Sequence, residues 1–561
     1  MGNDFRHNEP SARRTSLRRL SVGLLAVVAL FASACGSGSD DGGGDSSGDD
    51  VDAGTPVPGG ELVYGLEAET SGGWCLSESQ LAVSGIMVAR AIYDTLTVPD
   101  ADGEYVPFLA ESVESNEDYT QWTVTLRDGI TFHDGTALDS TVVKNNIDSW
   151  RGEYPGRNPL LMRFAYGNLA SVEVVDDLTL TITTNTPWPS LPAYLYYQGR
   201  VGIMAQAQLD DAEHCDQNLI GTGPFVEEEW VVNDHFTATK NPDYWRTDAD
   251  GQQLPYLDTV EFRPYPEADS RVNALLSGQL GALHASGANQ ILTLQEAADA
   301  GEIKIVQSGE YPEVSYGLLN TAKAPFDNPI ARQAAAAAVD LDELQQVINR
   351  DMLPKANGPF GPGSPGYLED TGFPDYDPEK AKELVAEYQA ETGEPLEFTF
   401  TIQNTPDVVA TAQLVQSQAE KVGVKVNIDP VEQATLISRA IAGDFQLLSF
   451  RNHAGGDPDL QYVWWYGGGI TNFGKFDDPE INALLDQGRA EADPAKREEI
   501  YQEINREFGK EVYNVWLNWS VWTIGTQNDV HGMLGPLLPD GQEPFPGLAD
   551  GHTLAGAWIS S

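Results

Sequence analysis

The chain has 561 residues, 41% of them apolar, which is enough for several domains and a large core. Its 85 acidic residues outweigh 33 basic ones and give a net charge of -52, which excludes nucleic-acid binding through phosphate neutralisation. Three cysteines and eight scattered histidines leave little material for a metal site, and we expect neither a metal nor another cofactor.

The N-terminus joins a basic stretch to a short apolar run over residues 20–34. Such a run is too short for a membrane-spanning helix, which needs about 20 apolar residues, but it fits the core of a secretory signal. It ends in Ala32-Ser33-Ala34-Cys35, which resembles the lipobox of bacterial lipoproteins. We predict a lipoprotein signal peptide over residues 1–34 and lipidation of Cys35, with a plain secretory signal as the alternative. The Arg13-Arg14 pair leaves general secretory and twin-arginine export both open.

A tether follows the predicted lipid anchor. Gly, Ser and Asp make up 19 of the 25 residues from 36 to 60, a composition that cannot bury apolar surface. Residues 35–60 are therefore predicted to be a lipidated cysteine with a disordered tether. The remaining chain is expected to be extracytoplasmic and anchored to the outer face of the cell membrane.

Two cysteines remain after the anchor, Cys75 and Cys215. An oxidising compartment favours a disulfide, and only one pairing is possible between two residues. The bridge would close a loop of about 140 residues. Two separate buried thiols are the alternative.

Strand and helix patterns alternate along the rest of the chain. Strict alternation predicts strands at 61–66 and 121–126, and a hairpin over 171–183. Asp-Pro pairs predict helix starts before 379–392, 480–490 and 495–508, the last helix ending at Gly509. This alternation favours α/β lobes with mainly parallel strands.

Motifs for catalysis are missing. The pattern from Gly469 to Lys475 has P-loop spacing but is followed by Phe476, where Mg²⁺ binding needs Ser or Thr. GxSxG and HExxH do not occur. Tryptophans at 464–465 precede three glycines, and their flat rings suit either ligand stacking or core packing. We therefore expect that the chain is not an enzyme.

Five blocks of sequence, in order, resemble the family 5 extracellular solute-binding proteins of ABC importers. The blocks are residues 93–96 with 105–112, 123–135, 221–225 with 241–245, 320–334, and 472–485. The resemblance covers about residues 60–530. Family members carry oligopeptides, dipeptides, nickel chelates or opines.

The resemblance implies a two-lobed fold of the type II periplasmic-binding-protein kind, with an extra subdomain in the first lobe. The first lobe is expected over 61–315 plus 522–561, with the extra subdomain at about 99–218, and the second lobe over 316–521. Chain crossings between lobes are expected near 310–320 and 515–525. A solute would be enclosed between lobes that close on this hinge.

The same resemblance implies the function and the partners. The chain is expected to capture an oligopeptide or a peptide-like solute and to deliver it to permease subunits and their ATPase, acting as a monomer without nucleic acid. A sugar-specific binding protein of the same fold is one alternative. A secreted carbohydrate-active hydrolase, which would use two carboxyl groups, is the alternative from another class.

One position departs from the peptide-binding pattern of the family. Peptide-binding members place an Asp for the peptide amine four residues before a Pro, and Ala454 stands there before Pro458. The loss of this anchor argues against ordinary di- and tripeptides. Candidate ligand-binding residues are Glu67, Trp74, Asn320, Arg451, Asn452, His453, Trp464, Trp465 and Trp519.

Overall fold

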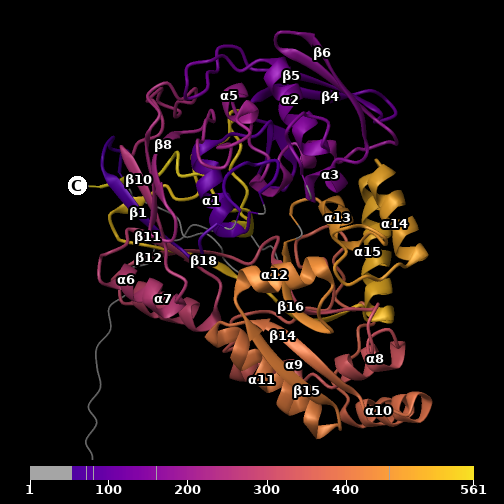
Figure 1. Cartoon of the computed structure of the whole chain (residues 1–561). Coiled ribbons are helices and arrows are strands. Elements are labelled where there is room, and N and C mark those ends of the chain that lie inside the picture. The colour runs from indigo at the N-terminus through magenta and orange to yellow at the C-terminus, as the bar shows by residue number, and fades with distance from the viewer. Residues whose placement is uncertain (1–53, 71, 80, 160, 454, 561) are drawn as a thin grey trace, which may run out of the picture. The chain divides into compact units, whose positions relative to one another are not determined.

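The computed structural model describes residues 54–560 except 71, 80, 160 and 454. The predicted signal peptide, Cys35, most of the tether and Ala454 therefore lie outside the described residues. In the described part, helices surround two large sheets and one smaller sheet, which confirms the α/β class predicted from the sequence (Figure 1).

A seven-stranded sheet organises the first lobe, in the order β12-β18-β11-β1-β10-β9-β8. Helix α1 packs against this sheet and buries nine of its ten residues. The strands are β1 (Glu61–Leu66), β8 (Phe225–Val231), β9 (His235–Lys240), β10 (Thr259–Pro264), β11 (Ala282–Ala285), β12 (Lys304–Ser308) and β18 (Trp522–Thr526); the helices are α1 (Val83–Ile92), α5 (Gln206–Asp210), α6 (Ala268–Leu276) and α7 (Ala288–Asp299).

A four-stranded antiparallel sheet, in the order β4-β5-β7-β6, lies within the segment assigned to the extra subdomain. Alternate residues of β5 are buried, as the sequence pattern predicted. The strands of this part of the chain are β2 (Thr97–Pro99), β3 (Tyr105–Pro107), β4 (Ala110–Ser115), β5 (Gln121–Leu126), β6 (Leu169–Asp176) and β7 (Thr179–Thr184). Its helices are α2 (Ser140–Arg151), α3 (Leu161–Ala165), α4 (Leu191–Tyr194) and the 3-10 turn η1 (Tyr197–Gly199).

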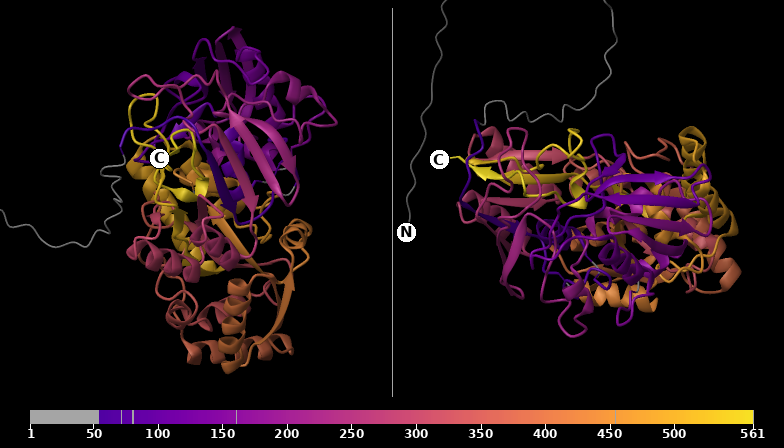
Figure 2. Two further views of the ribbon diagram at one scale, coloured as in Figure 1. Left: turned by 90° about the vertical axis from the view of Figure 1, so that its left-hand side faces the viewer. Right: turned by 90° about the horizontal axis from the view of Figure 1, so that it is seen from above.

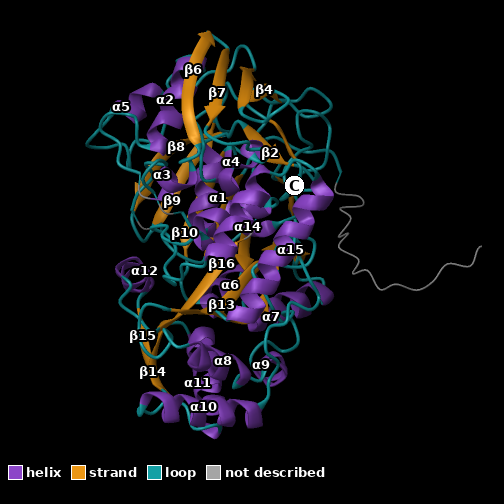
Figure 3. Ribbon diagram, turned by 90° about the vertical axis from the view of Figure 1, so that its right-hand side faces the viewer, coloured by secondary structure: helices purple, strands orange, loops and turns teal. Residues whose placement is uncertain are grey.

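The second lobe contains a five-stranded sheet in the order β15-β14-β16-β13-β17. Helices α8 to α11 gather around β14 and β15 at the end of this lobe (Figure 3). The strands are β13 (Glu313–Leu319), β14 (Glu397–Gln403), β15 (Lys425–Val431), β16 (Leu447–His453) and β17 (Asn514–Trp519). The helices are α8 (Pro329–Ala337), α9 (Leu341–Val347), α10 (Pro378–Thr392), α11 (Pro406–Lys421), α12 (Gln433–Ala442), η2 (Pro458–Gln461), α13 (Tyr462–Trp465), α14 (Pro479–Ala490) and α15 (Pro494–Glu511).

The chain passes between the two large sheets twice. It leaves the first sheet after Ser308 and enters the second at Glu313, three residues before the predicted start of the second lobe. It returns between Trp519 and Trp522. Two short crossings that lie close together are the covalent arrangement that a hinge requires.

The expectation of mainly parallel strands is wrong. Strand β1 is parallel to β10 and β11, and β14 is parallel to β15 and β16. The other pairs in both large sheets are antiparallel, because hairpins such as β8–β9 and the return crossing bring strands in from the opposite direction. Helix–strand alternation in the sequence does not reveal strands contributed from distant segments.

The C-terminal segment belongs to the first lobe. It contains β19 (Val530–His531), β20 (Trp558–Ile559) and the 3-10 turn η3 (Leu548–Asp550). Figure 2 shows this segment, in yellow, beside the first-lobe strands. Its apolar residues Leu548, Leu554 and Ala557 are buried in the same core as α1 and β1.

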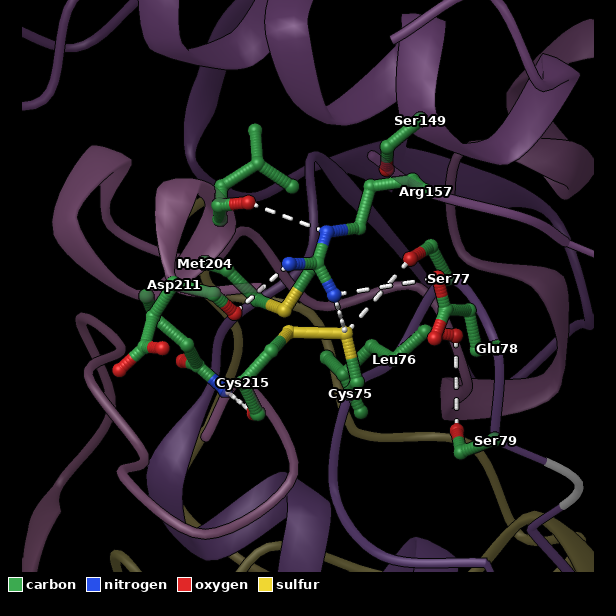
Figure 4. Close-up of a disulfide and its surroundings, with 12 residues drawn as sticks. Cys75, Leu76, Ser77, Glu78, Ser79, Ser149, Arg157, Met204, Asp211 and Cys215 are labelled. Carbon is green, nitrogen blue, oxygen red and sulfur yellow. Dashed lines mark hydrogen bonds and ion pairs between the residues drawn. A yellow bond between two sulfur atoms is a disulfide. The ribbon is translucent and has the colours of Figure 1, made fainter. Parts of the chain in front are cut away.

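A disulfide joins Cys75 to Cys215 (Figure 4). Arg157 lies against the bridge, where its Nη1 is 3.1 Å from Cys75 Sγ and its Nη2 donates to the carbonyl oxygen of Asp211 at 2.7 Å. The bridge ties the segment before α1 to the segment after α5. All four strands of the smaller sheet lie in the loop that it closes.

Candidate ligand-binding site

Polar side chains gather where the ends of β13 and β16 face the first lobe. The strands are antiparallel, with Glu313 opposite His453 and Ser315 opposite Arg451. This register places the first residue of β13 and the last residues of β16 side by side, at the same end of the two strands. Both ends lie beside the chain crossing.

Arg451 connects the two lobes through hydrogen bonds and ion pairs. Its Nη2 lies 3.1 Å from Glu67 Oε1 and its Nη1 is 3.3 Å from Ser286 Oγ, both in the first lobe. Its Nη1 is also 3.7 Å from Glu313 Oε2 of the second lobe. The side chain of Arg451 keeps 39% of its surface exposed and that of Glu67 keeps 21%, so a solute can reach both groups.

Charge and burial oppose each other at Glu67. Burial alone would raise the pKa of this carboxyl, but the positive charge of Arg451, with a smaller contribution from Arg271, holds it below its ordinary value. The charge of Glu313 raises the pKa of Arg451 further above its usual range. One guanidinium thus lies between carboxylates of both lobes and favours the ionised form of Glu67.

Aromatic side chains pack together beside this ion pair. The ring of His284 lies 5.4 Å from the ring of Trp522 and 5.7 Å from that of Tyr64, and His552 lies 5.9 Å from Tyr64. Trp522 Nε1 donates to Glu313 at 3.2 Å, and Arg451 lies 5.8 Å from the Trp522 ring centre. Burial lowers the pKa of His284 to about 4, so its ring is neutral at pH 7.

Several buried polar atoms around this junction have no hydrogen-bond partner among the described residues. Buried polar atoms in folded proteins are normally paired. A set of unpaired ones is therefore suited to a polar solute that supplies the missing partners. They are Tyr64 Oη, His284 Nδ1, Asn452 Nδ2, His453 Nδ1, Asp550 Oδ2 and His552 Nε2.

The structure brings four of the sequence candidates to this junction: Glu67, Arg451, Asn452 and His453. Asn452 and His453 are 5% and 6% exposed, respectively, so both residues lie beneath the surface of the junction. His453 contacts Asp550 of the C-terminal segment, and its carbonyl oxygen accepts a hydrogen bond from Gln198 at 2.9 Å.

The other five candidates lie in other surroundings. Asn320 donates to the carbonyl oxygens of Gly443 and Phe445 and fixes a turn. Trp74 packs edge-on against Trp230 and Phe236 in the first-lobe core. Trp465 and Trp519 are buried in the core of the second lobe, and half-buried Trp464 packs on Phe450 and Phe473.

Residues at the junction that sequence analysis missed are His284, Glu313, Asp550 and His552. None of them lies in a recognisable motif. Glu313 follows the first crossing directly, which is the one sequence signal that points to it.

Within the described residues, no group of three or more His, Cys, Asp or Glu side chains is arranged to hold a metal ion. In the same part of the chain, no helix combines the length and the apolar character needed to cross a bilayer.

Two α/β lobes joined by two crossings, with polar groups of both lobes meeting beside them, define a two-lobed binding protein. Residues 104–473 match the model described as bacterial extracellular solute-binding proteins, family 5 middle. The chain belongs to this family, whose members are binding proteins rather than enzymes.

Curated relatives and solved structures agree with this assignment. The glutathione-binding protein GsiB of Pectobacterium atrosepticum is 30% identical over 350 residues, 62% of this chain and 64% of the relative. The match thus spans just under two thirds of the curated relative. AgaA of A. tumefaciens R10, solved with agropinic acid, is 27% identical with a TM-score of 0.78, covering 90% of this chain and 99% of AgaA. DppA of Helicobacter pylori, solved with the peptide STSA, is 23% identical with a TM-score of 0.79 and the same coverages, and shows the fold alone.

Proposed function

We propose that this chain is the extracytoplasmic substrate-binding subunit of an ABC importer. It captures a peptide-like solute between its lobes and delivers it unaltered to the permease. Lipidation of Cys35 holds the protein at the outer face of the membrane, and residues 35–60 act as its tether. Membership of family 5 supports the class. The names of relatives, which mention glutathione, agropinic acid and peptides, support the kind of solute.

One observation carries this proposal. Arg451 of the second lobe pairs with Glu67 of the first at a position that remains partly open to solvent. A solute that enters here can exchange ion pairs with groups from both lobes and so stabilise the closed arrangement.

The test is a binding titration of the exported, purified protein with glutathione and a panel of tri- to pentapeptides. We expect saturable binding, a melting temperature that rises with solute concentration, and recovery of the bound solute chemically unchanged. Arg451→Met should weaken binding about tenfold or more, because it removes a charged partner from the site. Arg506→Met, on an exposed helix surface, is the matched control. Conversion of the solute, or equal binding by the Arg451 variant, would contradict the proposal.

A further inference from the structure

A buried arginine lies against one sulfur of the Cys75–Cys215 bridge and not against the other. The Nη1 of Arg157 is 3.1 Å from Cys75 Sγ, and Ser77 Oγ lies 3.8 Å from the same sulfur (Figure 4). Among the described residues, no side chain makes a hydrogen bond or an ion pair to Cys215 Sγ. The two sulfurs therefore differ in their electrostatic surroundings.

The backbone holds Arg157 in this position. Its Nε donates to the carbonyl oxygen of Leu209 at 3.1 Å, and its Nη2 donates to that of Asp211 at 2.7 Å. Its ion-pair partner Glu78 is partly exposed and more distant, with Oε1 3.8 Å from Nη1. Because a guanidinium does not lose its proton in a protein, its positive charge stays beside Cys75.

The two halves of the bridge also differ in how easily they open. Cys75 stands between Trp74 and Leu76, which are fully buried in the first-lobe core. Cys215 is buried as well, but it lies in a turn in which residues 212–214 and 217–218 are exposed. Exposed turns open locally at a lower cost in free energy than core segments do. A reagent from solvent therefore reaches Cys215 Sγ first.

We propose that the bridge exchanges in one direction: a small thiol forms a mixed disulfide with Cys215, and Cys75 leaves as a thiolate paired with Arg157. The small thiol first gives its proton to solvent. Its sulfur then forms a bond to Cys215 Sγ, the bond between the two cysteines breaks, and the electron pair of that bond stays on Cys75 Sγ. The small thiol is oxidised and Cys75 is reduced. A guanidinium stabilises a neighbouring thiolate, and a stabilised thiolate is the better leaving group.

The same arrangement closes the bridge again. The Cys75 thiolate attacks the Cys215 sulfur of the mixed disulfide and expels the small thiol, so no further oxidant is needed. Cys215 is thus the modified residue and Cys75 the resolving one. This exchange site lies outside the junction between the lobes and does not depend on which solute the protein carries.

Mass mapping of the folded wild type tests the direction of exchange. The protein is treated with 2-mercaptoethanol, quenched with acid, labelled with a maleimide at mildly acidic pH, and digested. We expect the mercaptoethanol adduct on Cys215 and the maleimide on Cys75, in about tenfold or greater excess over the reverse arrangement. Equal amounts, an excess of the reverse arrangement, or a bridge that opens only when the protein unfolds overturns the inference.

A pair of arginine variants tests the cause. Arg157→Met should lower this excess about tenfold, because Cys75 loses its neighbouring cation. Arg163→Met, at an exposed position of α3, is the matched control and should keep the excess. An unchanged excess in the Arg157 variant contradicts the inference.

Single-cysteine variants give a second readout that leaves Arg157 in place, in case Arg157→Met does not fold. Cys215→Ser leaves Cys75 as a free thiol, and Cys75→Ser leaves Cys215. The rate of alkylation by iodoacetamide is followed against pH, because the midpoint of this profile reports thiolate formation and not the accessibility of the sulfur. The midpoint for Cys75 should lie about one pH unit or more below that for Cys215. Equal midpoints, or a lower one for Cys215, overturn the inference.

Discussion

At the scale of single residues, Arg451 balances carboxylates that come from different lobes. Glu67 follows β1, and Glu313 begins β13 beside the crossing. Replacement of Arg451 therefore removes an attraction between lobes and also leaves two like charges close together. Partial exposure limits the cost to stability, so the effect should appear in binding and closure more than in unfolding.

The buried histidines predict how stability depends on pH. Burial lowers the pKa of His284 to about 4 and that of His552 to about 3, against an ordinary value of about 6.5. Below pH 6.5 these two histidines bind protons in the unfolded chain but remain neutral in the folded chain until their lowered pKa values are reached. The free energy of unfolding should fall as the pH drops, by up to about 1.4 kcal/mol per pH unit for each residue, until the folded pKa is reached.

Urea unfolding of wild type and His552→Asn at pH 7.5 and pH 5 measures this loss. The variant should lose less stability on acidification than the wild type. His214→Asn, whose side chain is 51% exposed, should behave as the wild type does. An unchanged loss in the His552 variant would mean that the folded protein protonates this ring without cost.

At the scale of elements, η2 and α13 belong to the second lobe in sequence but pack on the extra subdomain. Their residues Leu460 and Val463 are buried in the core of that subdomain. Asp459 accepts hydrogen bonds from Trp188 Nε1 at 2.9 Å and Ser190 Oγ at 2.7 Å, and from Arg489 Nε at 3.0 Å. The hydrogen bonds from Trp188 and Ser190 fix the second lobe to the subdomain, and the buried ion pair with Arg489 holds Asp459 in place within the second lobe.

Asp459→Asn should lower the free energy of unfolding by about 3–5 kcal/mol, because the buried Arg489 loses its counter-charge. Asp444→Asn breaks the exposed pair with Lys323 and should cost at most about 1 kcal/mol. Denaturant titrations of both variants check the contrast. Similar small losses in the two would show that Arg489 finds another partner.

Sequence predicts these elements well where the signal is local. Asp377, Asp478 and Asp493 each accept hydrogen bonds from the first helical N–H groups, with Pro next, as the Asp-Pro pairs indicated. The predicted end at Gly509 is wrong, because α15 continues to Glu511. Gly509 is needed for packing instead: a Cβ there would lie 2.2 Å from the carbonyl oxygen of Thr371.

The site is predicted less completely because its contacts are distant in sequence. Arg451 and Glu67 are 384 residues apart, and nothing local marks Asp550 as the neighbour of His453. The tryptophans proposed for stacking are mostly buried, since large rings gain more from a core than from an open surface. A sequence pattern thus identifies strand ends but not which of them meet.

At the scale of the whole molecule, the disulfide should matter for stability more than for binding. It closes a loop of 140 residues that contains the smaller sheet, and the side chains that contact Cys75 Sγ, Ser77 and Arg157, are not junction residues. Removing a cross-link over such a loop costs about 2–5 kcal/mol, chiefly through the entropy of the unfolded chain. Arg157 also loses its sulfur contact.

The double variant Cys75→Ser/Cys215→Ser should therefore melt at a clearly lower temperature than the wild type, with an unchanged affinity for any solute that the wild type binds. Dithiothreitol should lower the melting temperature of the wild type towards that of the double variant and leave the double variant unaffected. Calorimetry and titration well below the melting temperature check both statements. A loss of affinity with intact folding would mean that the bridge orders the junction through the segment before α1, and that stability and binding are coupled in this protein.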